Sequence, residues 1–199
     1  MFGRIWRVVS ALLAVLSGLA FGFLAGAGIV RAQAADPLAL MREGGNVLLV
    51  RHAATEAGVG DPPEFRLGDC RTQRNLSTAG RDQARKLGEA LRAAGIPMDA
   101  VRSSRWCRCV DTARLAFEPQ VAVETWPALD SFFSDRSAGP EQTRAALDAL
   151  AALPARSNWV WVTHQVNISA LTGSGAAPGE VIVARPVNGA LRVLGRWRP

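Results

Sequence analysis

The sequence predicts an α/β fold, a three-layer α/β/α sandwich with a largely parallel central sheet. Two apolar runs carry this prediction, the first at 47–50 and the second, NWVWVTH, at 158–164. Both are too short for a typical helix and are apolar without alternation, which is typical of strands buried on both faces. Segments with helical patterns lie between the predicted strands, and such alternation favours a parallel sheet covered by helices.

The clearest helical segment is NLSTAGRDQARKLGEALRAAG, which begins at Asn75. Ser77 can cap its first turn. Apolar residues at helical spacing form one stripe along it: Ala84, Leu87 and Leu91. Gly95 and Pro97 then supply the signals that end a helix. We therefore expect an amphipathic helix here.

The other elements follow from the same kinds of pattern. In chain order we expect a short helix at 37–43, a loop at 54–75, a strand at 100–102, a helix at 106–117, a strand at 121–123, a loop at 126–139, a helix at 140–153, a short helix after the strand that ends at 164, and a terminal hairpin of 181–184 and 191–194. Ser103 and Ser104 fall between a strand and a helix, so we expect them to serve the turn and cap the helix.

Residues 1–35 differ in composition from residues 36–199, which we expect to form one domain. Arg4 and Arg7 precede an uncharged stretch at 8–30 that is long enough to cross a bilayer and longer than a usual signal-peptide core. The small residues Ala32 and Ala34 nevertheless fit a cleavage site. A signal peptide and a membrane anchor both remain open, and both place the domain in the periplasm, either soluble or held at the inner membrane.

The chain has a formal net charge of +6, and Lys86 is its only lysine. The positive charge is scattered, which argues against a nucleic-acid partner. An exported protein with three cysteines is expected to contain one disulfide and one free thiol. Cys107 and Cys109 are too close in sequence to pair easily, so Cys70 is expected to pair with one of them. The spacings fit no zinc site, and we expect no metal or other cofactor.

The only two histidines, His52 and His164, come at the ends of the two most apolar strands. In open α/β sheets, ligands bind outside the carboxyl ends of the strands. One histidine in such a place is often structural. Two at equivalent places indicate a shared site.

Four segments, in order, make the chain resemble the histidine phosphatase superfamily, whose fold is phosphoglycerate mutase-like: LLVRHA, QRNLSTAGRDQARKLGEAL, SSRWCRCVDTA and VWVTHQVNI. The leader and the cysteine positions resemble small exported bacterial phosphatases of this superfamily. The resemblance implies that His52 is the nucleophile of a metal-independent phosphomonoesterase and forms a phosphohistidine. It implies that Arg51 and Arg108 bind phosphate and that His164 contacts the phosphoryl group and stabilises the transition state.

The leaving alcohol needs an acid to protonate it. One branch of the superfamily has an aspartate directly after the second histidine, where this chain has Gln165, so the resemblance is to the other branch. That branch uses an acidic residue in an L-x-E context, and Asp130, after Leu129, is the matching candidate. Asp135 and Glu124 are the alternatives. Mutases of the superfamily work in the cytosol. The leader predicts export, so it favours hydrolysis over mutase transfer.

Within the loop at 54–75, the part from Thr55 to Arg74 is expected to roof the site. Its three arginines suit an anionic substrate: Arg66, Arg71 and Arg74. We expect a small phosphorylated substrate, with an envelope phosphosugar suggested by location alone. The alternative is a non-catalytic envelope module that binds a phosphorylated sugar or a partner.

Overall fold

A computed structural model describes residues 36–58 and 60–199. Six strands form one sheet in the order β3-β2-β4-β1-β5-β6. The strands are β1 (Asn46–Arg51), β2 (Met98–Ser103), β3 (Val123–Thr125), β4 (Asn158–Thr163), β5 (Val181–Val187) and β6 (Ala190–Trp197). The four strands from β3 to β1 are parallel, and β5 and β6 add an antiparallel hairpin beside β1. The predicted α/β class with a largely parallel sheet is confirmed.

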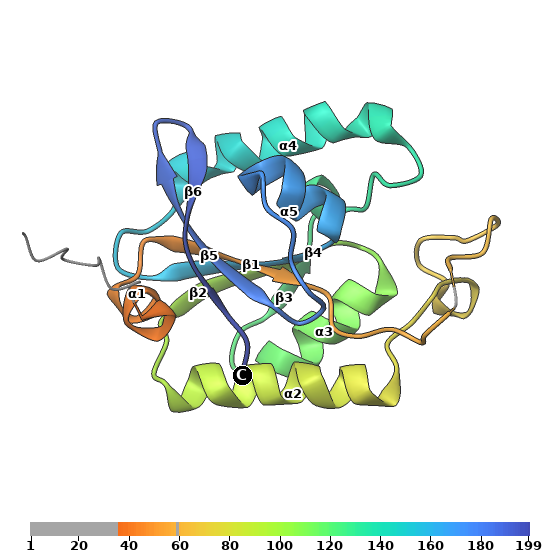
Figure 1. The fold of residues 1–199 in the computed structure, drawn as a ribbon, viewed down its shortest axis with the longest axis horizontal. Helices are drawn as coiled ribbons and strands as arrows, with labels where there is room; N and C mark the ends of the chain where they lie inside the picture. Colours follow the sequence, from red (N-terminus) through yellow and green to blue (C-terminus); the bar gives the residue numbers. More distant parts are fainter. Residues whose placement is uncertain (1–35, 59) are drawn as a thin grey trace, which may run out of the picture. The chain divides into compact units, whose positions relative to one another are not determined.

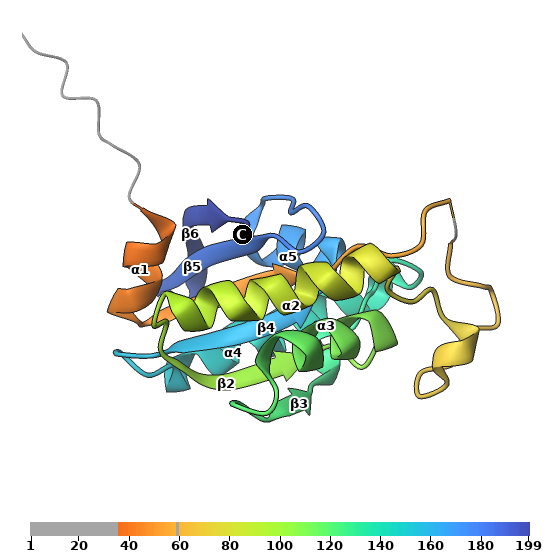
Figure 2. The same cartoon turned by 90° about the horizontal axis from the view of Figure 1, so that it is seen from below.

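Helices cover both faces of the sheet (Figures 1 and 2). On one face lie α1 (Pro37–Glu43), α2 (Thr78–Ala93) and α3 (Cys107–Phe117); on the other lie α4 (Gly139–Asp148) and α5 (Gln165–Thr172). Short 3-10 turns complete the chain: η1 (Cys70–Thr72), η2 (Pro127–Leu129), η3 (Arg136–Ala138) and η4 (Ala149–Ala152). The three-layer arrangement therefore agrees with the prediction from sequence.

Strand β1 is buried on both faces, as its unbroken apolar run predicts. Leu48 and Val50 pack into the core under α1, α2 and α3, whereas Val47 and Leu49 pack into the core under α4 and α5. All four side chains are fully buried. Successive strand residues point to opposite faces, so one short strand serves both cores.

The element ends differ from the predictions in a few places. Strand β3 covers Val123–Thr125, not 121–123. Its pairing with β2 begins where Val101 lies opposite Val123. The expected helix at 140–153 is α4 followed by the tighter η4. The terminal hairpin is longer than expected, and its turn residues Asn188 and Gly189 both have positive φ, as a two-residue hairpin turn requires.

The predicted leader lies outside the described residues, so its nature stays a prediction. Within residues 36–58 and 60–199, no helix is long and apolar enough to cross a membrane.

Candidate active site

His52 and His164 lie side by side because they follow neighbouring parallel strands. Arg51, the last residue of β1, is in register with Thr163, the last residue of β4. The backbone N–H of His52 donates to the carbonyl of Thr163 at 3.0 Å. The two imidazole rings meet edge to face, with centroids 5.5 Å apart. The expectation that both histidines share one site is met by this geometry.

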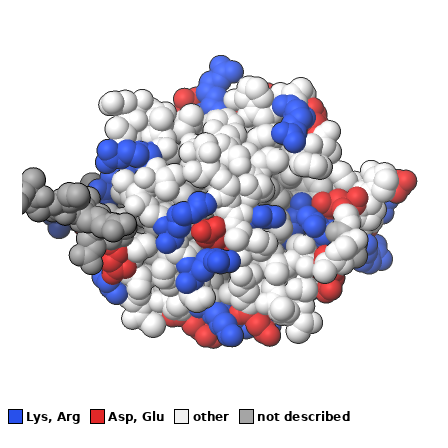
Figure 3. All heavy atoms as spheres, in the orientation of Figure 1, with Lys and Arg blue, Asp and Glu red and all other residues white. Residues whose placement is uncertain are grey.

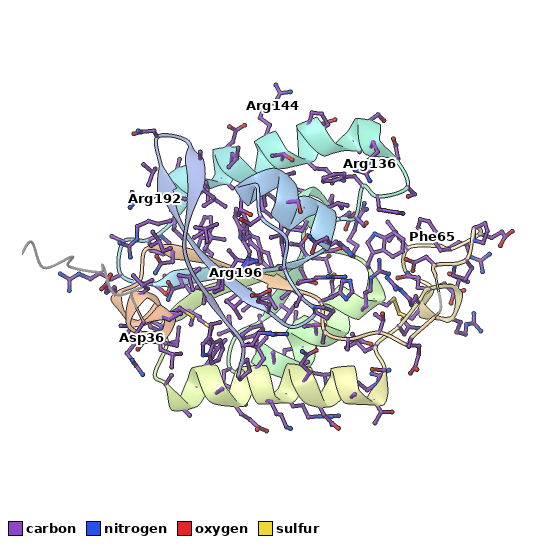
Figure 4. All side chains as sticks on the ribbon, viewed as in Figure 1. Asp36, Phe65, Arg136, Arg144, Arg192 and Arg196 are labelled. Atoms are coloured by element: carbon purple, nitrogen blue, oxygen red, sulfur yellow. A yellow bond between two sulfur atoms is a disulfide. The ribbon has the colours of Figure 1, made fainter. Side chains whose placement is uncertain are left out.

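The two histidines line a cavity of about 840 Å³ at the carboxyl ends of the strands. Its wall also includes Arg51, Asp61, Phe65, Arg74, Trp106, Arg108, Ser131, Phe133, Arg136 and Gln165. Figure 4 labels two of these residues, Arg136 near the start of α4 and Phe65 on the loop below it. Figure 3 shows basic atoms in a hollow on the same side. Basic and aromatic side chains together line the cavity.

The contacts of His52 define which ring nitrogen can attack. Nδ1 lies 2.9 Å from the carbonyl of Ala53. A carbonyl only accepts hydrogen bonds, so Nδ1 carries the proton and Nε2 keeps its lone pair. Burial, reinforced by Arg108, Arg51 and Arg74, lowers the pKa of His52 to about 3. The imidazole is therefore neutral, as a nucleophile must be.

The short segment after His52 is held by two helices. The hydroxyl of Thr112 in α3 accepts from the N–H of Ala53 at 3.0 Å, and the amide oxygen of Gln83 in α2 accepts from the N–H of Ala54, also at 3.0 Å. Gly80 lets α2 approach closely, because a Cβ there would collide with the carbonyl of Ala54. Thus Gly80, Gln83 and Thr112, which belong to the quoted motifs, position the histidine.

Three arginines of the cavity lining each have one unpaired donor. The Nε atoms of Arg51, Arg74 and Arg108 are buried and have no hydrogen-bond partner among the described residues. Burial, followed by the neighbouring arginines, lowers the pKa of Arg51, and burial also lowers that of Arg108. Buried guanidinium groups with free N–H donors are suited to a phosphate group. Arg51 and Arg108 are therefore placed as the resemblance implies.

Only one of the three loop arginines reaches the cavity. Arg74 lines it, whereas Arg66 and Arg71 are exposed and form ion pairs with Asp69 at 3.1 Å. The anionic-substrate hypothesis for Arg66 and Arg71 is thus not supported by their positions. Their carboxylate partner lies three and two residues away in sequence, so the charges are satisfied locally.

Asp130 lies behind His164 and is not part of the cavity wall. Its carboxylate is buried, and accepts from the N–H of Arg105 at 2.7 Å and from the hydroxyl of Ser104 at 3.1 Å. The guanidinium of Arg105 pairs with its other oxygen at 2.6 Å. The next residue, Ser131, lines the cavity in its place. Both oxygens of Asp130 are already engaged, so the geometry suits positioning better than proton donation.

The two alternative acids are also distant from the cavity wall. Asp135 is exposed and accepts hydrogen bonds from Ser137, which keep the pKa of its carboxyl low. Glu124 lies on β3 and faces Arg102 at 3.8 Å. Neither lines the cavity.

Ser104 does not cap a helix, contrary to the prediction from sequence. The N-cap of α3 is Trp106, which makes no side-chain capping bond. Instead, the Ser104 hydroxyl is fully buried and lies 2.8 Å from Nε2 of His164. Burial, followed by Arg108 and His52, holds the pKa of His164 well below its ordinary value. The turn role expected of Ser104 is borne out, because its hydroxyl accepts from the N–H of Trp106 at 3.2 Å, and Ser104 also belongs to the site.

Sequence reasoning missed the aromatic wall and Asp61. The rings of Phe65 and Trp106 stack with centroids 4.3 Å apart, and the guanidinium of Arg108 lies 4.5 Å from the centre of Trp106. Trp106 stands between two quoted motif serines and Arg108, but its spacing alone suggests no role. Asp61 precedes two prolines in a loop without periodicity, so no pattern singles it out.

The cysteines lie where the loop meets this site. The Sγ atoms of Cys70 and Cys107 lie at bonding distance, so Cys107 is the one of the two candidate partners that lies next to Cys70. Cys109 is free and buried, with Sγ 3.4 Å from Nε2 of His164. Burial raises the pKa of the Cys109 thiol to about 12, so it stays protonated. In the described part of the chain, no three His, Cys, Asp or Glu residues group as metal ligands.

Comparisons with known proteins agree with this geometry. Residues 47–143 match the profile of the histidine phosphatase superfamily (branch 1). No curated protein sequence gives a match. A candidate alpha-ribazole-5′-P phosphatase from Escherichia coli str. K-12 substr. MG1655 is a structural neighbour at 20% identity, with a TM-score of 0.56, covering 76% of this chain and 96% of its own.

Two further solved structures are similar. A candidate phosphohistidine phosphatase SixA from Agrobacterium tumefaciens has 18% identity and a TM-score of 0.55, with 78% and 99% of the two chains covered. The mycobacterial glucosyl-3-phosphoglycerate phosphatase Rv2419c has 17% identity and a TM-score of 0.54, with 77% and 98% covered. At these identities the likeness establishes the shared fold. With the family profile, the fold and the two strand-end histidines, the chain belongs to the histidine phosphatase superfamily (branch 1), as a phosphoric monoester hydrolase that acts through a phosphohistidine.

Proposed function

We propose that this phosphatase hydrolyses small phosphomonoesters in the periplasm, without a metal ion, and that Nε2 of His52 carries the phosphoryl group. The observation that supports the proposal most directly is a neutral His52 beside three arginines with unused, buried donors. These arginines supply the positive charge that a metal ion supplies in other phosphatases.

The reaction has two transfers. Nε2 of His52 attacks phosphorus, and the bond from phosphorus to the ester oxygen breaks, so the alcohol leaves with its electron pair and takes up a proton. Water then attacks the phosphohistidine, the N–P bond breaks, and inorganic phosphate leaves. Arg51 and Arg108 contact the phosphoryl oxygens in both transfers, and their charge and hydrogen bonds offset the charge that moves. Neutral His164 acts through Arg108, because its Nδ1 lies 3.5 Å from a guanidinium nitrogen of that arginine and helps to position it.

The substrate class is proposed from the cavity and the leader. An opening of about 840 Å³ with aromatic and arginine walls suits a phosphate attached to a ring-sized organic group. The predicted leader would deliver the domain to the envelope, where phosphorylated sugars are candidate substrates. Fractionation of cells that express the full chain tests the location, and a panel of phosphosugars, phosphoproteins and nucleotides tests the class.

His52→Ala is the experiment that tests the mechanism. Wild-type protein mixed with a phosphomonoester and quenched rapidly is expected to carry an acid-labile, alkali-stable phosphoryl label, which His52→Ala lacks along with turnover. Full wild-type activity is expected in EDTA. Turnover by His52→Ala would overturn the nucleophile assignment, and activity that EDTA removes and added metal restores would overturn metal independence. A wild-type domain that binds phosphosugars without turnover would favour the non-catalytic envelope module.

A further inference from the structure

Asp61 is the only carboxylate among the described residues that line the cavity. Its Oδ1 accepts from a guanidinium N–H of Arg108 at 2.9 Å and from the backbone N–H of Arg74 at 3.1 Å. Its Oδ2 has no hydrogen-bond partner among the described residues, and the side chain is 22% exposed. The free protein therefore holds a carboxylate on the arginine that is proposed to bind phosphate, with one carboxylate oxygen unpaired among the described residues.

The segment that carries Asp61 is fixed beside Arg108. Cys70, nine residues later, lies at bonding distance from Cys107, and the side chain of Gln73 accepts from the N–H of Cys107 at 2.9 Å. The backbone of Arg74 holds Asp61 directly. These contacts keep the carboxylate at the cavity wall, whereas the carboxylate of Asp130 is buried and saturated behind His164.

We propose that Asp61 is the proton donor to the leaving alcohol, and that it occupies the phosphate position on Arg108 until substrate displaces it. This inference rests on the proposed function. A phosphate dianion that binds Arg108 removes the cation partner of Asp61 and adds a negative neighbour, and both changes favour the protonated carboxyl. Asp61 and His52 line the same cavity, so the displaced side chain stays in the space that would hold the ester oxygen.

The proton balance closes over one turnover. The carboxyl of Asp61 gives its proton to the ester oxygen as the O–P bond breaks and the bond from His52 Nε2 to phosphorus forms. The resulting carboxylate takes a proton from the water that attacks the phosphohistidine, as the N–P bond breaks. Asp61 is then protonated again, and release of phosphate returns the proton to solvent as the carboxylate rebinds Arg108.

Asp61→Asn tests the proposal through the leaving group. An alkyl phosphate releases an alkoxide that needs a proton, whereas p-nitrophenyl phosphate releases a stable phenolate. We expect kcat/KM for the alkyl phosphate to fall roughly 10²–10⁴-fold, and for p-nitrophenyl phosphate far less. Glu64→Gln is the matched control, because it removes one negative charge from an exposed position on the same segment outside the cavity wall. It is expected to leave both rates unchanged.

A second readout separates a catalytic role from a structural one. Asp61→Asn removes the carboxylate that competes for Arg108, so inorganic phosphate is expected to inhibit p-nitrophenyl phosphate hydrolysis more tightly. Equal losses on both substrates, or weaker phosphate inhibition, would overturn the proposal. Asp61→Ser gives the same test if the asparagine variant does not fold. Failure of the proposed function is distinguishable, because then the wild type itself would form no phosphohistidine from either substrate.

Discussion

The hydroxyl of Ser104 lies 2.8 Å from Nε2 of His164. The same hydroxyl donates its proton to Asp130 at 3.1 Å, so it must accept from His164, whose Nε2 carries the hydrogen. Nδ1 is then the unprotonated nitrogen, and a guanidinium nitrogen of Arg108 lies 3.5 Å from it. One serine thus fixes the tautomer and orientation of His164, with Asp130 fixing the serine.

Ser104→Ala is expected to lower activity on alkyl phosphates and on p-nitrophenyl phosphate by similar factors, because His164 then no longer positions Arg108, which binds the phosphoryl group common to both. It also leaves the buried Nε2–H of His164 without its closest partner, which typically costs about 1–3 kcal/mol of unfolding free energy. Steady-state kinetics and urea unfolding measure the two effects. Ser103→Ala is the control, since the Ser103 hydroxyl donates to a backbone carbonyl instead. A loss confined to alkyl phosphates would contradict the positioning role.

The stability of the protein is expected to fall as pH falls below 6.5. The pKa of His52 is lowered from 6.5 to about 3 in the folded chain, and that of His164 is also lowered. Between pH 6.5 and about 3 the unfolded chain binds protons at these sites and the folded chain does not. Protonation therefore stabilises the unfolded state relative to the folded state. The slope for His52 alone is roughly 1.4 kcal/mol per pH unit in this window.

Urea unfolding between pH 7 and 5 checks this slope, since most carboxylates stay ionised there. His52→Asn is expected to flatten it. An unchanged slope in the variant would show that the buried imidazole is not its source.

Inorganic phosphate is expected to stabilise the fold by binding the three arginines that have unpaired buried Nε atoms. Saturation to 100 times Kd adds about 2.7 kcal/mol by mass action. Thermal unfolding in phosphate and in chloride at equal ionic strength measures the effect. Arg74→Ala should weaken it, whereas Arg66→Ala, on the same segment but paired with Asp69, should not. Equal shifts in both variants would locate the phosphate elsewhere.

Protein isolated from its native compartment without reductant is expected to show one free thiol after unfolding, from Cys109. A bond between Cys70 and Cys107 spans a sequence separation of 37 residues and would contribute about 4 kcal/mol in the chain-entropy treatment. Thiol titration of the unfolded protein measures the number of free thiols per chain. Three free thiols would contradict both the bond and the oxidising location; a Cys109→Ser variant with none would confirm the pairing.

The sequence was most informative where local pattern and burial coincide. The runs at 47–50 and 158–164 predicted both central strands and the place of both histidines, because a short apolar run indicates a strand buried on two faces and ligands bind beyond the carboxyl ends of such strands. It was least informative where a role depends on a distant partner. Asp130 follows a leucine as the motif predicts, but Arg105 and Ser104 turn its carboxylate away from the cavity. Asp61 accepts a hydrogen bond from Arg108, which lies 47 residues later, and no periodic pattern in the sequence predicts such a contact.

The hydrogen bonds of Ala53 and Ala54 also have a consequence for local stability. Their amides lie outside regular secondary structure, yet they are bonded to side chains of α3 and α2. In hydrogen exchange these amides should therefore open with the core strands and not with the neighbouring loop. The nucleophile then belongs to the most cooperative part of the molecule, so its position is expected to be lost only when the core itself opens.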